Sequence, residues 1–177
     1  MGVTMQLTNR SNRLLRPAKP WFVYASLFFG LVLNYVPFGH HPGIPDWAAL
    51  VLVFWCIREP LYIGMGAGFL LGILVDIGQS TAMGEHALAY VVLAFIANGL
   101  ARRIMWFPSL LQALHVLPML LVAQALMVCV RMFAENEFPG WDYFLSSAVG
   151  AALWLPLTYL LLLPQFQPVD RDENRPI

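Results

Sequence analysis

Apolar residues along the chain are concentrated in six blocks, separated by short polar or proline-containing segments. A helix needs about 20 mainly apolar residues to cross the ~30 Å hydrocarbon core of a bilayer. We therefore predict membrane-spanning helices at 21–37, 46–57, 61–77, 85–101, 108–132 and 142–163. The second block is the shortest. About twelve residues rise only ~18 Å, so this segment tilts, uses flanking residues or does not cross fully. Pro118 and Pro156 are expected to kink the last two helices.

The third block carries Gly64, Gly68 and Gly72 at a spacing of four, which places them on one face of the expected helix. In a soluble protein each helical glycine would cost about 1 kcal/mol relative to alanine. In a bilayer, small residues allow two helices to approach closely. We therefore predict that this face packs against another helix. The run at 64–68 superficially resembles a nucleotide-binding loop, but it opens no strand-to-helix turn, so packing is favoured.

Asp76 continues the glycine row by one more step of four. A polar turn follows at 78–81, and Gly84 then opens the next apolar block. A carboxylate at this place either accepts hydrogen bonds from the turn and the next helix, or is a buried group that serves a substrate or a coupling ion. The polar turn favours the structural role, with Asp76 and Gly84 setting the turn, and the functional role stays open.

The composition supports an integral membrane protein. Of the 177 residues, 59% are hydrophobic and 11% are charged, whereas soluble domains average about 25% charged residues. The mean hydropathy is +0.67. We predict an all-α integral membrane protein with a single bundle of about six transmembrane helices at 20–163. A basic tail at 1–19 and a charged tail at 164–177 would flank this bundle.

Positive charges are distributed unevenly between the two ends of the predicted spans. If all six spans cross and the N-terminus is cytoplasmic, only Arg131 of the 10 basic residues faces outward. Trp21 and Trp106 then lie at the inner interface, and Trp47 and Trp141 lie at the outer one. The remaining basic residues, which we place in the cytoplasm with both termini, are Arg10, Arg13, Arg16, Lys19, Arg58, Arg102, Arg103, Arg171 and Arg175.

No known catalytic, nucleotide-binding or metal-binding motif occurs in the sequence. The adjacent His40 and His41 cannot easily chelate one ion, and no third ligand is evident. Cys56 and Cys129 lie in separate apolar blocks and are expected to be inert buried thiols. We therefore predict no enzymatic activity, no metal or other cofactor and no nucleic-acid partner.

Several polar side chains lie in or beside the apolar blocks. Gln112 lies in the fifth block, and His86 and His115 are expected to form hydrogen bonds between helices rather than to bind a ligand. Arg131 can extend to the outer interface and pair with Glu135, four residues later.

Several segments, taken together in this order, resemble the MreD family, the rod shape-determining membrane proteins of bacteria. The resemblance covers nearly the whole chain beyond the basic N-terminus, and the ordered set is more specific than any one segment. The segments are PDWAALVLVFW at 45–55, GxxxGFLLGILVDIGQSTAMGEHALAY at 64–90, RRIMWFP at 102–108, LLQALHVLPMLLVAQ at 110–124, FPGW at 138–141 and VDRDENRPI at 169–177.

The resemblance implies a non-enzymatic scaffold of the elongasome in the bacterial inner membrane. MreD-like proteins work with the bitopic protein MreC, the actin-like filament MreB, a SEDS glycosyltransferase and a class B penicillin-binding protein. The resemblance therefore implies a role in rod shape and lateral peptidoglycan synthesis, in contact with membrane lipid. We expect the outer segments to present a surface to MreC through Trp47, Glu135, Phe138 and Trp141.

The MreD family also resembles the substrate-binding membrane components of energy-coupling vitamin transporters. A small-molecule-binding subunit is therefore the alternative. Its pocket would be lined by Asp76, His86, Gln112 or His115.

Overall fold

A computed structural model of the chain describes residues 18–36, 43–136 and 138–165, with the side chain of Glu135 excepted. The basic residues before residue 18, the histidines at 40–41 and the charged end of the chain lie outside the described residues. Within those ranges the chain is all-helical and contains no strand, as predicted. The α-helices are α1 (Pro20–Tyr35), α2 (Trp47–Arg58), α3 (Met65–Gln79), α4 (Glu85–Ile104), α5 (Ser109–Glu135) and α6 (Leu145–Leu162).

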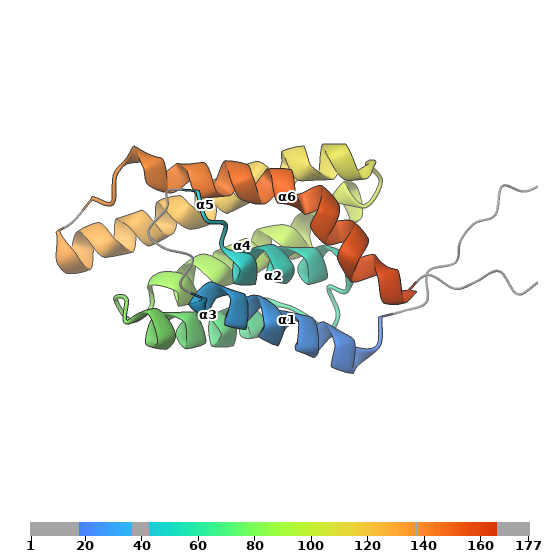
Figure 1. The fold of residues 1–177 in the computed structure, drawn as a ribbon, viewed down its shortest axis with the longest axis horizontal. Helices are drawn as coiled ribbons and strands as arrows, with labels where there is room; N and C mark the ends of the chain where they lie inside the picture. The colour runs from blue at the N-terminus through green and yellow to red at the C-terminus, as the bar shows by residue number, and fades with distance from the viewer. Residues whose placement is uncertain (1–17, 37–42, 137, 166–177) are drawn as a thin grey trace, which may run out of the picture.

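Two short 3-10 helices flank α6: η1 (Trp141–Phe144) precedes it and η2 (Leu163–Gln165) follows it. Pro118 and Pro156 lie inside α5 and α6, and each helix continues through its proline. Figure 1 shows that α6 changes direction in its second half, where Pro156 lies. A proline inside a helix removes one hydrogen bond and clashes with the preceding turn, which accounts for a bend of this kind.

The third helix begins later than the sequence suggested. The prediction of a helix from residue 61 is wrong, because residues 59–63 form a turn in which Tyr62 and Ile63 both donate backbone hydrogen bonds to the Glu59 carbonyl. Gly64 is consequently the N-cap of α3 and not a residue inside the helix. A Cβ at Gly64 would lie 3.6 Å from the side-chain nitrogen of Asn98, an ordinary contact, so packing does not require glycine there.

Gly68 and Gly72 lie against α4 at very short range, and α3 and α4 run side by side in opposite directions (Figure 1). A Cβ at Gly68 would be 2.7 Å from the Tyr90 carbonyl oxygen, and one at Gly72 would be 2.5 Å from the Ala87 backbone nitrogen. Because backbone atoms cannot move away as a flexible side chain can, these two positions require glycine at the observed helix separation.

The second helix is enclosed by the others. Every residue of α2 from Ala48 to Ile57 is buried, and α2 packs on α1, α4 and α6 (Figure 1). A helix that is apolar on all sides is buried either by other protein elements or by lipid, and in α2 it is buried by protein. Its Trp55 illustrates this, since the indole is buried and donates a 2.7 Å hydrogen bond to Ser26 of α1.

The surrounding helices expose large apolar side chains on the outside of the bundle. In water such a continuous apolar surface would drive association or aggregation. In the part of the chain that the structure describes, three helical stretches are long and apolar enough to cross a membrane: Glu85–Ile104, Ser109–Ala134 and Trp141–Gln165. The shorter α1, α2 and α3 are also apolar. The exposed apolar side chains include Trp21, Phe28 and Phe29 of α1, Phe69 and Leu70 of α3, Phe95 of α4, Leu110 and Leu114 of α5, and Tyr159 and Leu160 of α6.

Charges separate between the two ends of the bundle. The start of α1 and the ends of α2, α4 and α6 lie at one end (Figure 1). We call this the basic end, because it holds Lys19, Arg58, Arg102 and Arg103, with Glu59 as the one acid among the described residues there. The opposite end, at which α3 ends and α2 and α4 begin, is the acidic end. It holds Asp46, Asp76, Glu85 and Asp142, together with Arg131.

Two alanine substitutions on α3 test the close packing. In Gly72→Ala the new methyl group meets the α4 backbone, so we expect a loss of about 1–3 kcal/mol and a thermal midpoint roughly 2–10 °C lower. Gly66→Ala is the matched control, because nothing lies within 4 Å of a Cβ at Gly66. It should leave the midpoint unchanged or raise it. Equal midpoints for the two variants in detergent would contradict this account.

Candidate functional site

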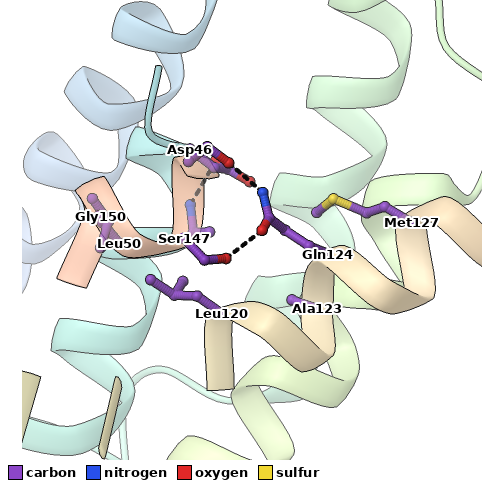
Figure 2. Close-up of a pocket in the computed structure, with 10 residues that line it drawn as sticks. Asp46, Leu50, Leu120, Ala123, Gln124, Met127, Ser147 and Gly150 are labelled. Carbon is purple, nitrogen blue, oxygen red and sulfur yellow. Dashed lines mark hydrogen bonds between the residues drawn. The ribbon is translucent and has the colours of Figure 1, made fainter. Parts of the chain in front are cut away.

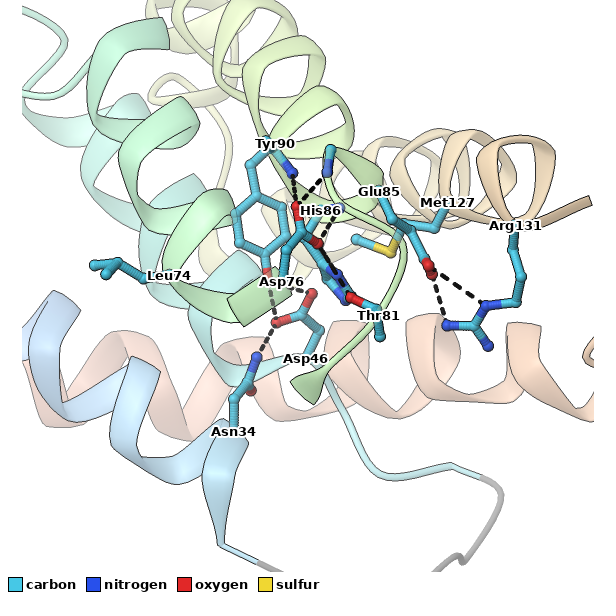
Figure 3. A network of polar contacts seen from close by, with 12 residues as sticks. Asn34, Asp46, Leu74, Asp76, Thr81, Glu85, His86, Tyr90, Met127 and Arg131 are labelled. Carbon is cyan, nitrogen blue, oxygen red and sulfur yellow. Dashed lines mark hydrogen bonds and ion pairs between the residues drawn. The ribbon is translucent and has the colours of Figure 1, made fainter. Parts of the chain in front are cut away.

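Asp76 at the end of α3 caps the start of α4. Its carboxylate is buried and accepts hydrogen bonds from the backbone N–H groups of Gly84 (2.9 Å) and His86 (2.9 Å) and from the Thr81 hydroxyl (3.2 Å) (Figure 3). The first N–H groups of a helix have no partner inside that helix. Asp76 supplies the partners from the neighbouring helix, and its negative charge also suits the positive end of the α4 dipole.

His86 joins the same carboxylate through its ring. Its Nδ1 lies 2.8 Å from Oδ1 of Asp76, so this nitrogen carries the hydrogen when the carboxylate is ionised. The ring also packs edge-on against Tyr90, with 5.9 Å between the ring centroids. The hydrogen bond links α3 to α4, and it holds the imidazole in one orientation. The turn between these helices closes through Gly84, whose φ of 99° only glycine adopts without strain.

Asp46 caps a second helix in the same region. Its carboxylate accepts a hydrogen bond from Ala49 N at the start of α2 (3.0 Å), from the Asn34 amide (2.9 Å) and from the Tyr90 hydroxyl (2.7 Å) (Figure 3). The side-chain oxygen of Asn34, Oδ1, in turn accepts a 2.9 Å hydrogen bond from the backbone N–H of Trp47. Asp46 thus joins the end of α1, the start of α2 and the second turn of α4.

Glu85 and Arg131 form an ion pair between α4 and α5. The Arg131 Nη2 lies 2.6 Å from Glu85 Oε1, and Glu85 is fully buried. The predicted pairing of Arg131 with Glu135 stays a prediction, because the side chain of Glu135 lies outside the described residues. A buried carboxylate needs a charged partner, and Glu85 meets this need through a residue 46 positions away. The Arg131 guanidinium also lies over the Tyr143 ring, 5.7 Å from its centroid.

Gln124 connects α5 with the start of α6. Its amide nitrogen donates a 3.0 Å hydrogen bond to the Tyr143 carbonyl and a second bond to Ser146, and its oxygen accepts from the buried Ser147. Figure 2 shows the hydrogen bond between Ser147 and Gln124, two of the residues that line a cavity of about 20 Å³. A cavity of this size holds about one water molecule.

A larger polar cavity of about 160 Å³ lies among these groups at the acidic end. The Nε1 of Trp47, one of its lining residues, is buried and has no hydrogen-bond partner in the described part of the chain. The cavity has room for several water molecules or a small polar group. Its polar lining consists of Asn34, Asp46, Trp47, Gln79, His86, Gln124, Tyr143 and Ser146.

The other polar residues that the sequence singled out lie elsewhere. Gln112 donates to the Phe107 carbonyl at 2.9 Å, near the basic end. The prediction of an interhelical hydrogen bond for His115 is wrong, because its Nδ1 contacts the Leu111 carbonyl of its own helix at 2.8 Å, and its ring stacks on Phe107. Of the residues named for a ligand pocket, His86 alone lines the polar cavity among the described residues.

The expected outer surface divides into exposed and buried members. Trp141 is 81% exposed and Phe138 is 47% exposed, and their rings pack edge to face. Trp47 is not an exposed surface residue, because it packs against the hydrophobic core at the start of α2. The side chain of Glu135 lies outside the described residues. The aromatic pair of Phe138 and Trp141 is therefore the accessible part of this surface.

Sequence reasoning missed Asp46, Tyr90 and Ser147 as members of the polar groups. Asn34 and Gln124 gave a signal, since an amide inside an apolar block needs a partner, but the sequence did not identify that partner. Asp46 also gave a sequence signal, because it directly precedes a helix and fits the N-cap preference. Tyr90 and Ser147 gave no sequence signal, because these residue types are common in membrane helices.

Comparisons with known proteins agree with one another. The family model described as "rod shape-determining protein MreD" matches residues 16–163. A protein of Haemophilus influenzae named "Rod shape-determining protein MreD" is 32% identical over 149 residues, which cover 80% of this chain and 89% of that protein. No solved structure matches the chain.

The cap on α4 can be tested by changing Asp76. Asp76→Ala leaves buried N–H groups of α4 without a partner, so we expect a loss of about 2–3 kcal/mol in folding free energy. Asp76→Asn retains one acceptor oxygen and should lose less. Thermal unfolding of the purified protein measures both. Asp142→Asn, a change of an exposed carboxylate at the same end, is the control, and a loss as large as that of Asp76→Ala would contradict the capping role.

A double-mutant cycle can measure the Glu85–Arg131 pair. Arg131→Gln leaves a buried carboxylate without its ion partner and should cost about 3–5 kcal/mol. The double variant with Glu85→Gln should be more stable than Arg131→Gln alone, because the unpaired charge is gone. If the two substitutions are simply additive in unfolding experiments, the pair makes no specific contribution.

Proposed function

We infer the function from one premise: the chain belongs to the MreD family of rod shape-determining proteins. It is accordingly a membrane protein of the rod-shape system. We propose that it acts without catalysis, as a scaffold of the elongasome in the bacterial inner membrane. In this role it supports lateral peptidoglycan synthesis by holding other membrane components together.

The proposed topology has six spans, with both termini in the cytoplasm and the helical bundle at 20–163. The separation of charges supports it, because Lys19, Arg58, Arg102 and Arg103 gather at the end where α1 begins and α6 ends. The short α2 does not oppose it. Since α2 is enclosed by protein, its length need not match the thickness of the surrounding lipid.

The exposed aromatic pair of Phe138 and Trp141 is the observation that best supports a scaffold. Both rings lie at the acidic end, where Trp141 is the first residue of η1, and they contact each other. Nearby, the Asp46, Asp76 and Glu85 carboxylates hold the helix ends in place by hydrogen bonds and an ion pair. Exposed aromatic rings on a rigid support are typical of residues that dominate binding at protein interfaces.

The proposed direct partner is the bitopic protein MreC, near its membrane anchor. MreB, the SEDS glycosyltransferase and the class B penicillin-binding protein would be joined directly or through MreC. In this mechanism the protein positions its partner proteins and catalyses no reaction. The polar groups at the acidic end would keep the aromatic pair in a fixed geometry for the partner.

In-cell photocrosslinking tests this partner surface. A photoreactive amino acid at position 138 or 141 should crosslink mainly to a bitopic partner, and one at position 160 on the apolar face of α6 should not. Trp141→Ala should reduce the adduct from position 138 by about tenfold or more, as expected for a dominant aromatic contact. Adducts dominated by a multi-pass membrane subunit that couples a transporter to its ATPase would instead support a transporter.

The second candidate function is small-molecule binding, as in the substrate components of vitamin transporters. The polar cavity of about 160 Å³ supports it, because it has room for a small polar group and Asn34, Asp46 and His86 are among its lining residues. The test is a thermal-shift titration of purified protein with water-soluble vitamins. Saturable stabilisation would favour this candidate, and the absence of any shift would count against it.

A further inference from the structure

A second sizeable cavity lies at the basic end of the bundle. Its volume is about 350 Å³, and it is formed where α2 and α4 end. Arg58 comes from α2, Pro60 from the following turn, Arg102 and Met105 from the end of α4, and Trp106 from the segment after it. The polar cavity at the acidic end shares none of these residues.

Two guanidinium groups line this cavity. Arg58 is half-buried and is held over the ring of Phe54, one turn earlier in α2, with 5.3 Å from its Cζ to the ring centroid. Arg102 is exposed. Neither side chain forms an ion pair with another described residue. The nearest acid in sequence is Glu59, whose carboxylate accepts a 3.4 Å hydrogen bond from Ala18 N.

Helix electrostatics account for part of this arrangement. The last turn of a helix carries partial negative charge, so basic residues such as Arg58 and Arg102 are favourable there. This preference explains why the residues are basic. It does not explain why both arginines line one cavity, because an arginine that only neutralises carbonyl groups can extend freely into water. Two full positive charges also exceed the partial charges of the two helix ends.

The surface around the cavity is apolar. Leu61 is 96% exposed, Trp106 is 89% exposed and Leu110 is 67% exposed, all at the basic end. These side chains require acyl chains or the interfacial region rather than water. The guanidinium groups therefore lie at the depth where lipid headgroups meet acyl chains. A free phosphate ion would satisfy the charges but would leave the apolar rim uncovered.

We propose that this cavity binds the headgroup of an anionic phospholipid. Arg58 and Arg102 donate hydrogen bonds to the phosphate oxygens, for which the planar guanidinium is well suited. The acyl chains of the bound lipid cover Leu61 and Trp106. The site is independent of the scaffold role, and its failure would leave that role untouched.

The test uses the purified full-length protein in detergent and native mass spectrometry of bound lipid. Dioleoyl phosphatidylglycerol is the anionic probe, and dioleoyl phosphatidylcholine is the zwitterionic one. We expect the wild type to retain phosphatidylglycerol in preference to phosphatidylcholine. Arg102→Gln and Arg58→Gln should each reduce phosphatidylglycerol retention about fivefold. Because Arg102 is exposed, its replacement should not disturb folding.

Arg103→Gln is the matched control. It removes the same charge from the next residue of α4, which does not line the cavity, and it should keep retention within about twofold of the wild type. Equal losses for Arg102→Gln and Arg103→Gln would overturn the proposal in favour of general surface attraction. Displacement of the lipid by millimolar inorganic phosphate would overturn it in favour of a free-anion site. Unchanged retention in Arg102→Gln would overturn it outright.

Discussion

The acidic end of the bundle depends on the need to satisfy helix ends where water is scarce. Each helix begins with N–H groups that have no partner in that helix, and in hydrocarbon an unpaired group of this kind costs several kcal/mol. Asp76 and Asp46 meet this need for α4 and α2, and each also bonds a side chain of α4 (His86 and Tyr90). The hydrogen bonds that complete the helix ends therefore also fix the helices relative to one another.

The glycine face and the Asp76 cap depend on each other. Gly68 and Gly72 allow the α3 and α4 backbones to approach closely, and only this approach brings the Asp76 carboxylate within 2.9 Å of the first N–H groups of α4. The shared row along one helix face explains why small residues and an acid occur at the same spacing of four. The close packing of the two backbones and the hydrogen bonds of Asp76 are consequently two parts of the same interface between α3 and α4.

Much of the fold could be predicted from the sequence, because the length and order of apolar blocks record which segments become helices. The start of α3 could not, since residues 61–63 of the turn are apolar like the helix that follows, and their hydrogen bonds are what distinguish them from it. The polar partners of Asp46 and Arg131 were also missed. Tyr90 lies 44 residues from Asp46, and Glu85 lies 46 residues from Arg131. A polar residue inside an apolar stretch of sequence indicates that it needs a hydrogen-bond or ion partner. Only the packing of the helices determines which residue that partner is.

The enclosed α2 is one of three helices that span counting by length leaves out, the other two being α1 and α3. Among the described residues, length and composition select three helical stretches, because that criterion assumes a helix surrounded by lipid, which must match ~30 Å of hydrocarbon. Every residue of α2 from Ala48 to Ile57 is covered by protein, so its ends can be completed by side chains such as Asp46 instead of by the bilayer interface. A short central helix is then compatible with a membrane bundle. The charge separation between the two ends, which does not depend on helix length, becomes the stronger guide to topology.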